Sequence, residues 1–309
     1  MHPPSGRPSA SPYPRITAPG RELRALGFGD DPIARPLTYP GRLPSGSGLL
    51  VDGCFLGLHA DHLCPSSGGS AARTGAPPGR WILDTSAVPP QIFGGPEVPL
   101  DDALRSCGGP LMADRRPVLA VGSNASPAQI VRKLAGRTRV VVPMTYARVD
   151  GLVAGASAHV SRPGYVPAVP VLEPGASTEL VVLWLDDEQL AAVDATEPNY
   201  HRTRLPASAA VSLPGLGRLR ACDLYAGRHG CLIDQGGAPI RPAGQPELLA
   251  RLLATSPGLS PLTGARTPEE FVARTRSASE LRDAIRRLWR RERRVLAQPE
   301  LPAGPTATP

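Results

Sequence analysis

The sequence predicts an α+β protein, and its patterning and composition carry the prediction. From residue 117 onwards, short apolar runs typical of buried strands alternate with capped, amphipathic segments typical of helices. Apolar residues make up 41% of the 309 residues but aromatic residues only 4%, so the core must consist mainly of aliphatic side chains. Glycine (33 residues) and proline (38 residues) are abundant, which predicts long loops.

Strands are predicted where apolar and β-branched residues run together. Such segments cover residues 117–121, 140–145, 148–154, 179–185 and 218–225, with a further short one at 81–83. Residues 48–58 predict a hairpin, because Asp52 and Gly53 supply the two positive-φ positions of a tight turn between apolar arms.

Helix starts are predicted by capping boxes, in which an N-cap side chain and a Gln or Glu three residues later bond to each other's backbone. Such pairs are Ser126 with Gln129, Asp186 with Gln189, Thr267 with Glu270, and Ser277 with Glu280. The first predicts a helix over residues 127–135, and a Leu-rich helix is expected at 246–254. The last helix would bury one face made of Leu281, Ile285, Leu288 and Val295.

These elements divide the chain into five predicted regions. Residues 1–20 and 299–309 are rich in Pro, Ser or Gly and are expected to be disordered. Residues 21–116 predict a β-rich appendage with a flexible linker at 65–80. Residues 117–230 form the main predicted domain, followed by a C-terminal helical extension over 231–298.

The charge of the chain is a weak sign of nucleic-acid binding. The formal net charge is +7, and Lys133 is the one lysine among 34 basic residues, a bias toward arginine that GC-rich coding would produce. The seven arginines between residues 279 and 296 predict an amphipathic helix with a solvated basic face. Polyanion binding by this helix is the alternative.

The remaining bulk features predict a cytoplasmic protein without a metal. Five irregularly spaced cysteines do not predict a disulfide framework, and neither a secretory leader nor an apolar run of about 18 residues is present in the sequence. Cys54, His59, His62 and Cys64 are suitable zinc ligands by type, but the last two are too close together for a common structural site. Neither a cofactor nor a particular oligomeric state is predicted.

The first candidate for a functional site is Gly122-Ser123-Asn124. A strand ends there and a helix begins, so backbone N–H groups and the positive end of the helix dipole are expected to converge. Gly122 would let a ligand approach the main chain closely. Gly, Ser and Asn are also ordinary turn residues, so a purely structural turn is the alternative.

The second candidate is Glu197, just after the helix that starts at Asp186. Pro198 favours an extended conformation for the residue before it, so Glu197 is expected to follow the helix end. A carboxylate near the negative end of a helix dipole holds a proton more tightly, which suits a general base. An exposed acid at a helix end is the alternative.

Together, the two stretches resemble the gamma-glutamylcyclotransferase family. That family has a Tyr-Gly-Ser-Asn loop after its first strand, and later a strand, a helix and a Leu-Asp-x-x-Glu-Gly segment followed by a tyrosine and a basic residue. The matching residues are Val121-Gly122-Ser123-Asn124 and Val193-Asp194-Ala195-Thr196-Glu197-Pro198, then Tyr200, Arg202 and, on a late strand, Tyr225. The resemblance covers about residues 117–226.

The resemblance implies a small mixed β-sheet or barrel with flanking helices and a cofactor-independent reaction. Its implied substrate is a gamma-glutamyl amine or peptide, from which 5-oxoproline is released with Glu197 as general acid and base. The implied substrate-binding residues are Val121, Gly122, Ser123, Asn124, Ala125, Tyr200 and Tyr225. His159 is a further candidate for the pocket wall, with a buried, hydrogen-bonded structural histidine as its alternative.

Three positions depart from the family pattern. Val121 stands where the family has tyrosine, Ala125 where it has a large apolar residue, and Pro198 where it has glycine. These changes leave the loop and the base in place but alter the pocket wall. Two functions therefore stay open: an enzyme of this class, or a non-catalytic small-molecule-binding or protein-interaction member of the same fold.

Overall fold

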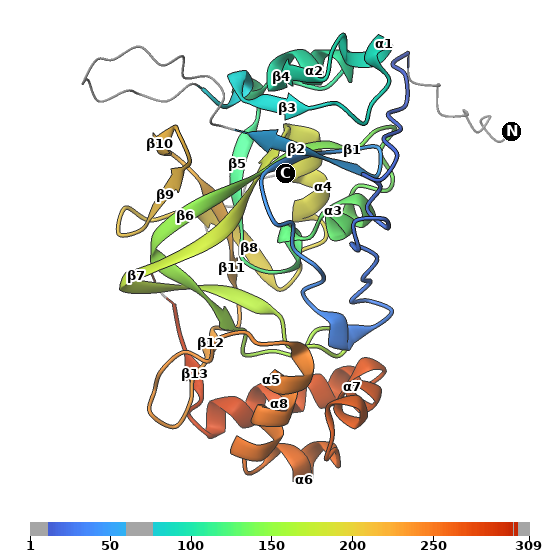
Figure 1. Cartoon of the computed structure of the whole chain (residues 1–309). Coiled ribbons are helices and arrows are strands. Elements are labelled where there is room, and N and C mark those ends of the chain that lie inside the picture. Colours follow the sequence, from blue (N-terminus) through green and yellow to red (C-terminus); the bar gives the residue numbers. More distant parts are fainter. Residues whose placement is uncertain (1–11, 60–76, 299, 302–309) are drawn as a thin grey trace, which may run out of the picture.

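The computed structural model describes residues 12–59, 77–298 and 300–301, and a mixed sheet forms its centre (Figure 1). In spatial order its strands are β4 (Glu97–Pro99), β3 (Ile82–Asp84), β2 (Cys54–His59), β1 (Gly48–Val51), β6 (Val141–Ala156), β7 (Ala168–Leu185), β5 (Arg116–Ala120), β11 (Asp223–Gly227) and β8 (Tyr200–Arg204). β9 (Ala210–Leu213) pairs with β6 and with β10 (Gly217–Arg218). β5 and β11 run parallel. With helices around this sheet, the predicted α+β class is confirmed.

Helices lie at both ends of the sheet and along one side (Figure 1). α1 (Pro90–Phe93) and α2 (Leu100–Ser106) accompany the N-terminal strands, and α3 (Pro127–Lys133) and α4 (Asp187–Asp194) follow β5 and β7. α5 (Gln245–Thr255), α6 (Leu259–Thr263), α7 (Pro268–Arg276) and α8 (Ser279–Arg291) gather at the opposite end. The predicted extension 231–298 also contains a two-stranded sheet of β12 (Cys231–Leu232) and β13 (Val295–Leu296).

Two predicted strands are parts of one longer strand. Residues 140–145 and 148–154 both belong to β6, because pairing with β7 continues through Tyr146 and Ala147. The register shifts only at Gly151, which has a φ of 79°. Conversely, the predicted strand 218–225 is split into β10 and β11, because the chain changes its partner there from β9 to β8.

The predicted hairpin is confirmed, and it holds part of the segment that the sequence predicts to be disordered. Asp52 and Gly53 have φ angles of 48° and 87°, as this turn requires. The Asp52 carboxylate accepts hydrogen bonds from the Ile16 backbone N–H at 2.9 Å and from Arg139 Nη2 at 2.6 Å. Ile16 is only 1% exposed, so the prediction of disorder is wrong for the stretch around it. Packing against the hairpin orders a segment whose composition is typical of a loop.

Some predictions fall on residues that the structure does not describe. These residues are 1–11, 60–76, 299 and 302–309. They include much of the predicted N-terminal and C-terminal disorder, most of the predicted linker 65–80, and the candidate zinc ligands His62 and Cys64. No helix in the described ranges is long and apolar enough to cross a membrane.

The capping-box prediction is confirmed at Asp186, holds only for the N-cap bond at Thr267, and fails at Ser126 and Ser277. Asp186 accepts from the Gln189 N–H at 2.8 Å, with Gln189 Oε1 accepting from the Asp186 N–H, and Thr267 accepts from the Glu270 N–H. The Ser126 side chain makes no capping bond, because the Gln129 N–H donates to the Ser126 carbonyl instead, and the Gln129 side chain contacts Arg132 and the Asp30 carbonyl. α8 starts after Ala278 and ends before Val295, which belongs to β13.

The cap of α4 gives a testable contribution to stability. Asp186→Ala is expected to lower the free energy of unfolding by about 1 kcal/mol, because the first turn of α4 loses an acceptor. The matched control is Asp187→Ala, whose side chain is 80% exposed and pairs only with Arg116, so about 0.5 kcal/mol or less is expected there. Urea unfolding measures both variants, and equal losses would contradict the capping role.

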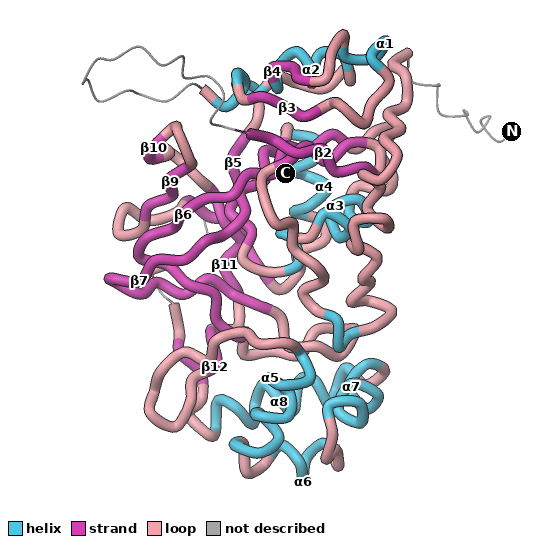
Figure 2. Tube along the Cα trace, in the orientation of Figure 1, coloured by secondary structure: helices cyan, strands magenta, loops and turns pink. Residues whose placement is uncertain are grey.

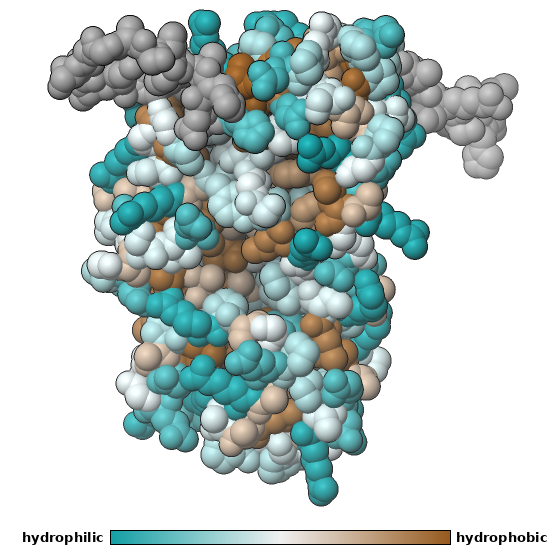
Figure 3. Space-filling model, viewed as in Figure 1, coloured by the Kyte–Doolittle hydropathy of each residue, from teal (hydrophilic) through white to brown (hydrophobic). Residues whose placement is uncertain are grey.

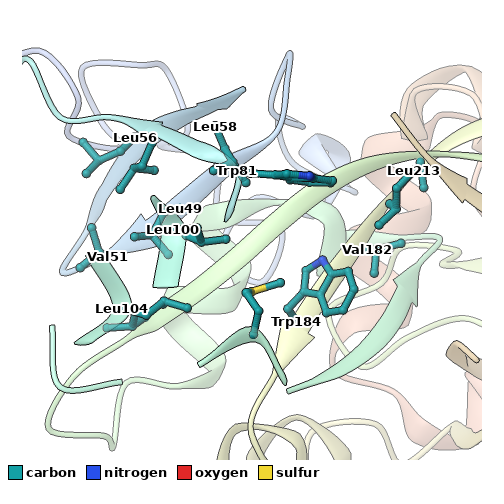
Figure 4. Packing of buried hydrophobic residues seen from close by; sticks show 14 of the residues in the cluster. Leu49, Val51, Leu56, Leu58, Trp81, Leu100, Leu104, Val182, Trp184 and Leu213 are labelled. Atoms are coloured by element: carbon teal, nitrogen blue, oxygen red, sulfur yellow. The ribbon is translucent and has the colours of Figure 1, made fainter. Parts of the chain in front are cut away.

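The core cluster drawn in Figure 4 is mainly aliphatic, as the composition predicts, and contains two of the three buried tryptophans. Trp81 precedes β3 and packs in the same cluster as Trp184 of β7, together with leucines of β1, β2 and α2. Trp184 Nε1 donates to Thr145 Oγ1 at 3.0 Å, so its buried N–H is satisfied. β1 pairs with β6 across the predicted boundary at residue 117, and the domain boundaries themselves stay a prediction.

A long N-terminal loop connects the two ends of the molecule. Figure 2 shows the chain before β1 running along one side, from the hairpin end toward α5 and α7. Arg276 of α7 donates to the backbone carbonyls of Ile33 and Ala34 in this loop. On the face drawn in Figure 3, hydrophilic residues cover much of the C-terminal helices, and hydrophobic residues gather across the middle. This loop also contributes Ile33 and Tyr39 to the wall of the cavity described next.

Candidate active site

A cavity of about 600 Å³ lies where the turn after β5 faces the turn after α4. Most of the predicted site residues line it: Val121, Gly122, Ser123, Asn124, His159, Glu197, Tyr200 and Tyr225. β5 and β7 are antiparallel neighbours, so the chain leaves β7 beside the start of β5, and α4 then brings it back to the end of β5, where Glu197 meets Asn124. This topology brings together two motifs that are more than 70 residues apart in the sequence.

Asn124 and Glu197 join the two motifs directly. Asn124 Nδ2 donates to Glu197 Oε1 at 2.9 Å. The Glu197 side chain is 13% exposed, and its turn is fixed by a bond from its N–H to the Asp194 carbonyl at 3.1 Å. The carboxylate therefore faces the cavity rather than bulk solvent. Arg202, a possible competing partner for Glu197, pairs instead with Asp194 and Asp223.

Lys133, the last residue of α3, is a site residue that the sequence motifs did not indicate. Its Nζ donates to Glu197 Oε1, the same oxygen that Asn124 contacts, and its side chain is only 5% exposed. Burial lowers the pKa of Lys133, while the Glu197 carboxylate acts in the opposite direction. One carboxylate oxygen of Glu197, the candidate base, therefore accepts hydrogen bonds from both the Lys133 ammonium and the Asn124 amide.

The amide oxygen of Asn124 has no hydrogen-bond partner within the described part of the chain. The Asn124 side chain is buried, and a buried acceptor without a donor is costly unless a ligand or water supplies one. Beside the Glu197 carboxylate, this oxygen favours a ligand group rich in N–H donors.

Two expectations about the loop are corrected. Ala125 does not line the cavity: it is buried in the core, because residues Ser123–Ala125 form a 3-10 turn that directs its side chain inward. The same turn uses backbone N–H groups that were expected to bind substrate. The Ala125 N–H donates to the Gly122 carbonyl and the Ser126 N–H donates to the Ser123 carbonyl.

Tyr39, from the N-terminal loop, occupies the space beside Gly122. A methyl group added at Gly122 would lie 2.4 Å from the Tyr39 hydroxyl, so a residue with a side chain cannot replace this glycine without displacing the tyrosine. The hydroxyl accepts a hydrogen bond from the Ala168 N–H at 2.9 Å, and the ring stacks on Tyr165 with centroids 4.3 Å apart. Across residues 12–59 and 77–298, its own proton has no acceptor, so it can donate into the cavity.

The tyrosines of the cavity keep their protons. Burial raises the pKa of Tyr39 above its usual range and that of Tyr165 to about 12. Burial also raises the pKa values of Tyr200 and Tyr225, and the charge of Glu197 acts in the same direction on all four. Tyr200 donates to the Ala168 carbonyl at 2.8 Å, and Tyr225 donates to Asp194 Oδ1 at 2.7 Å.

His159 combines both roles that the sequence left open. It lines the cavity but is buried, and its Nδ1 lies 2.6 Å from Ser157 Oγ. Burial lowers its pKa to about 3, so the ring is neutral at physiological pH. Its ring centroid lies 4.7 Å from that of His229.

Positive charge exceeds negative charge around the cavity. Among the described residues that line it, Arg132, Lys133, Arg162 and Arg276 are basic and Glu197 is acidic. With Lys133 paired to Glu197, the three arginines favour a ligand that carries a carboxylate or another anionic group.

Comparisons with known proteins give distant likenesses in fold. No protein-family model matches the chain, and no curated protein matches its sequence. A solved structure described as a gamma-glutamyl cyclotransferase is similar, at 13% identity and a TM-score of 0.31, over 56% of this chain and 99% of that one. An uncharacterized protein from Homo sapiens gives 16% identity and a TM-score of 0.32, over 56% and 98%.

A protein from Arabidopsis thaliana with a solution structure gives 16% identity and a TM-score of 0.29. That match covers 37% of this chain and 62% of the Arabidopsis protein, so it spans less than two thirds of the latter. The solved cyclotransferase carries the name of the family that the sequence motifs resemble.

Proposed function

We propose that the protein releases 5-oxoproline from a gamma-glutamyl amine or peptide, with Glu197 as general base and acid. The observation that carries the proposal is the bond between Asn124 and Glu197 across the cavity, because it unites the two motifs on which the resemblance rests. The reaction needs no metal or cofactor, and a cytoplasmic site of action stays part of the proposal.

The protein does not have to bring two substrates together, because both reacting groups belong to one molecule. Glu197 takes a proton from the substrate's α-ammonium, and the resulting amine attacks the γ-carbonyl carbon. A five-membered ring closes as the new C–N bond forms. The attacking nitrogen loses a second proton as the bond to the leaving amine breaks, and both protons pass by way of Glu197 to that amine, which leaves as an ammonium.

A donor for the oxyanion is the second requirement. We assign this role to the Tyr39 hydroxyl, whose oxygen is fixed by the Ala168 N–H and whose proton is free to donate. Tyr39 reaches Gly122 from the N-terminal loop, next to the position where the resembled family has a tyrosine and this chain has Val121.

The charged residues around the cavity restrict the class of substrate that we propose. The α-carboxylate of a gamma-glutamyl group would be attracted by Arg132, Arg162 and Arg276, which line the cavity with Lys133. Since three arginines exceed what one carboxylate needs, a leaving amine that carries its own carboxylate is favoured over a simple alkylamine.

A substrate panel tests the proposal. Gamma-glutamyl amino acids, a gamma-glutamyl tripeptide and gamma-glutamyl alkylamides are each incubated with the protein, and 5-oxoproline is followed by chromatography. Release is expected from the gamma-glutamyl compounds, fastest where the leaving amine carries a carboxylate. The α-glutamyl isomers are the control, because their amide carbonyl is not placed to close the same ring. Binding of the panel without any release would favour the non-catalytic alternative.

A further inference from the structure

Lys133 is exceptional in the sequence as well as in the site. It is the one lysine in a chain with 34 basic residues, and it lies at the candidate base. Arginine is the usual choice for a buried ion pair, because its guanidinium stays protonated and binds a carboxylate at two points. A lysine presents a compact ammonium whose pKa responds to its surroundings.

The geometry places a ligand ammonium close to Lys133. A substrate's α-ammonium must reach Glu197, and the unpartnered Oδ1 of Asn124 offers it a second acceptor. Lys133 Nζ is bonded to that same carboxylate. When substrate is bound, two ammonium groups therefore share one carboxylate in a largely buried place. Two like charges in such a place disfavour each other, and a proton leaves more readily.

We propose that Lys133 is a charged positioning residue that keeps Glu197 ionised to receive a proton and disfavours the charged form of the substrate's α-ammonium beside it. This inference rests on the proposed function and extends it. In the step, one proton moves from the α-nitrogen to the Glu197 carboxylate, and Lys133 keeps its three protons. The product of the step is the neutral amine that attacks the γ-carbonyl.

Besides Lys133 and Glu197, the titratable residues that line the cavity in the described part of the chain are arginines, tyrosines and one histidine. Arg132 on the same helix, and Arg162 and Arg276, are the other basic residues of the cavity wall among the described residues. Tyr39, Tyr165, Tyr200 and Tyr225 stay neutral because burial raises their pKa values. His159 stays neutral because burial lowers its pKa to about 3.

A pH profile gives the first test. In Lys133→Met, the pH profile of kcat, which reports the groups of the enzyme–substrate complex, is expected to move to higher pH by about one unit, because both Glu197 and the bound amine lose their protons less readily without the nearby positive charge. Lys133→Arg keeps the charge and should keep the position of the profile. Arg137→Gln removes an equal charge from the surface pair with Glu188 and is the matched control, with no shift expected.

A residue with a purely structural role would lower the rate without moving the profile. A profile of Lys133→Met that superimposes on the wild-type profile would therefore overturn the proposal.

A second test needs no turnover and uses the wild-type chain. Lysine labelled with ¹⁵N gives one side-chain signal, because the sequence contains one lysine, so the pKa of Lys133 can be followed by NMR. Coupling between two charges is reciprocal: a bound ammonium must lower the pKa of Lys133 by as much as Lys133 lowers that of the ligand. Saturating L-glutamate is expected to lower the pKa of Lys133 relative to saturating glutarate, which has the same two carboxylates but no ammonium.

The two tests separate the two proposals. If no gamma-glutamyl compound is turned over but L-glutamate lowers the pKa of Lys133, the proposed reaction fails and the coupling stands. If L-glutamate does not bind, or leaves the pKa of Lys133 at its value with glutarate, the role of Lys133 is wrong even in an active enzyme.

Discussion

Glu197→Gln is expected to lower the rate of 5-oxoproline release by about 10²- to 10⁴-fold, the range for loss of a positioned general base. Glutamine has nearly the same shape and can still accept from Lys133 and Asn124, so the contacts of Glu197 Oε1 can persist. What it lacks is the ability to take and return a proton. The loss should appear in kcat, and binding of substrate should change much less.

The control for this variant is Glu188→Gln, because Glu188 lies on α4, the helix that precedes Glu197. The Glu188 side chain is 81% exposed and pairs with Arg137 at the surface. It removes the same charge without touching the cavity, and wild-type turnover is expected. Urea unfolding of both variants separates a loss of chemistry from a loss of fold. A Glu197→Gln variant that is folded and turns over at the wild-type rate would show that another group is the base.

Local signals in the sequence predicted the parts of the fold that local geometry decides. Asp52 and Gly53 adopt the positive φ angles that their turn needs, and Asp186 caps α4 with Gln189 as predicted. Strand lengths were predicted poorly, because pairing partners set them. β6 continues through residues that break the apolar pattern, since β7 supplies backbone partners on the neighbouring strand.

Only those residues of the candidate site that belong to sequence motifs could be predicted. The loop at Gly122–Asn124 and Glu197 were found from their order along the chain, and the structure brings them within hydrogen-bond distance. Tyr39 could not be found in this way, because it lies in an irregular loop more than 80 residues before Gly122 and no local pattern connects the two. Lys133 did carry a signal: it is a lone lysine in a chain that otherwise uses arginine.

Tyr39→Phe is expected to lower kcat by about 100-fold while KM changes little, because an oxyanion donor acts mainly in the transition state. The variant removes the hydroxyl but keeps the ring, so stacking on Tyr165 is retained. The reduction should be the same between about pH 6 and pH 9, because burial raises the pKa of Tyr39 above its usual value of about 10 and the phenol stays protonated throughout.

Tyr146→Phe provides the matched control for that loss. Tyr146 donates to the Pro44 carbonyl and does not line the cavity, so its variant loses one hydrogen bond without losing a cavity donor. Both variants are compared by steady-state kinetics and by urea unfolding. A raised KM with an unchanged kcat in Tyr39→Phe would mean that Tyr39 only shapes the pocket. The oxyanion donor would then have to be sought among the backbone N–H groups of the turn that follows β5.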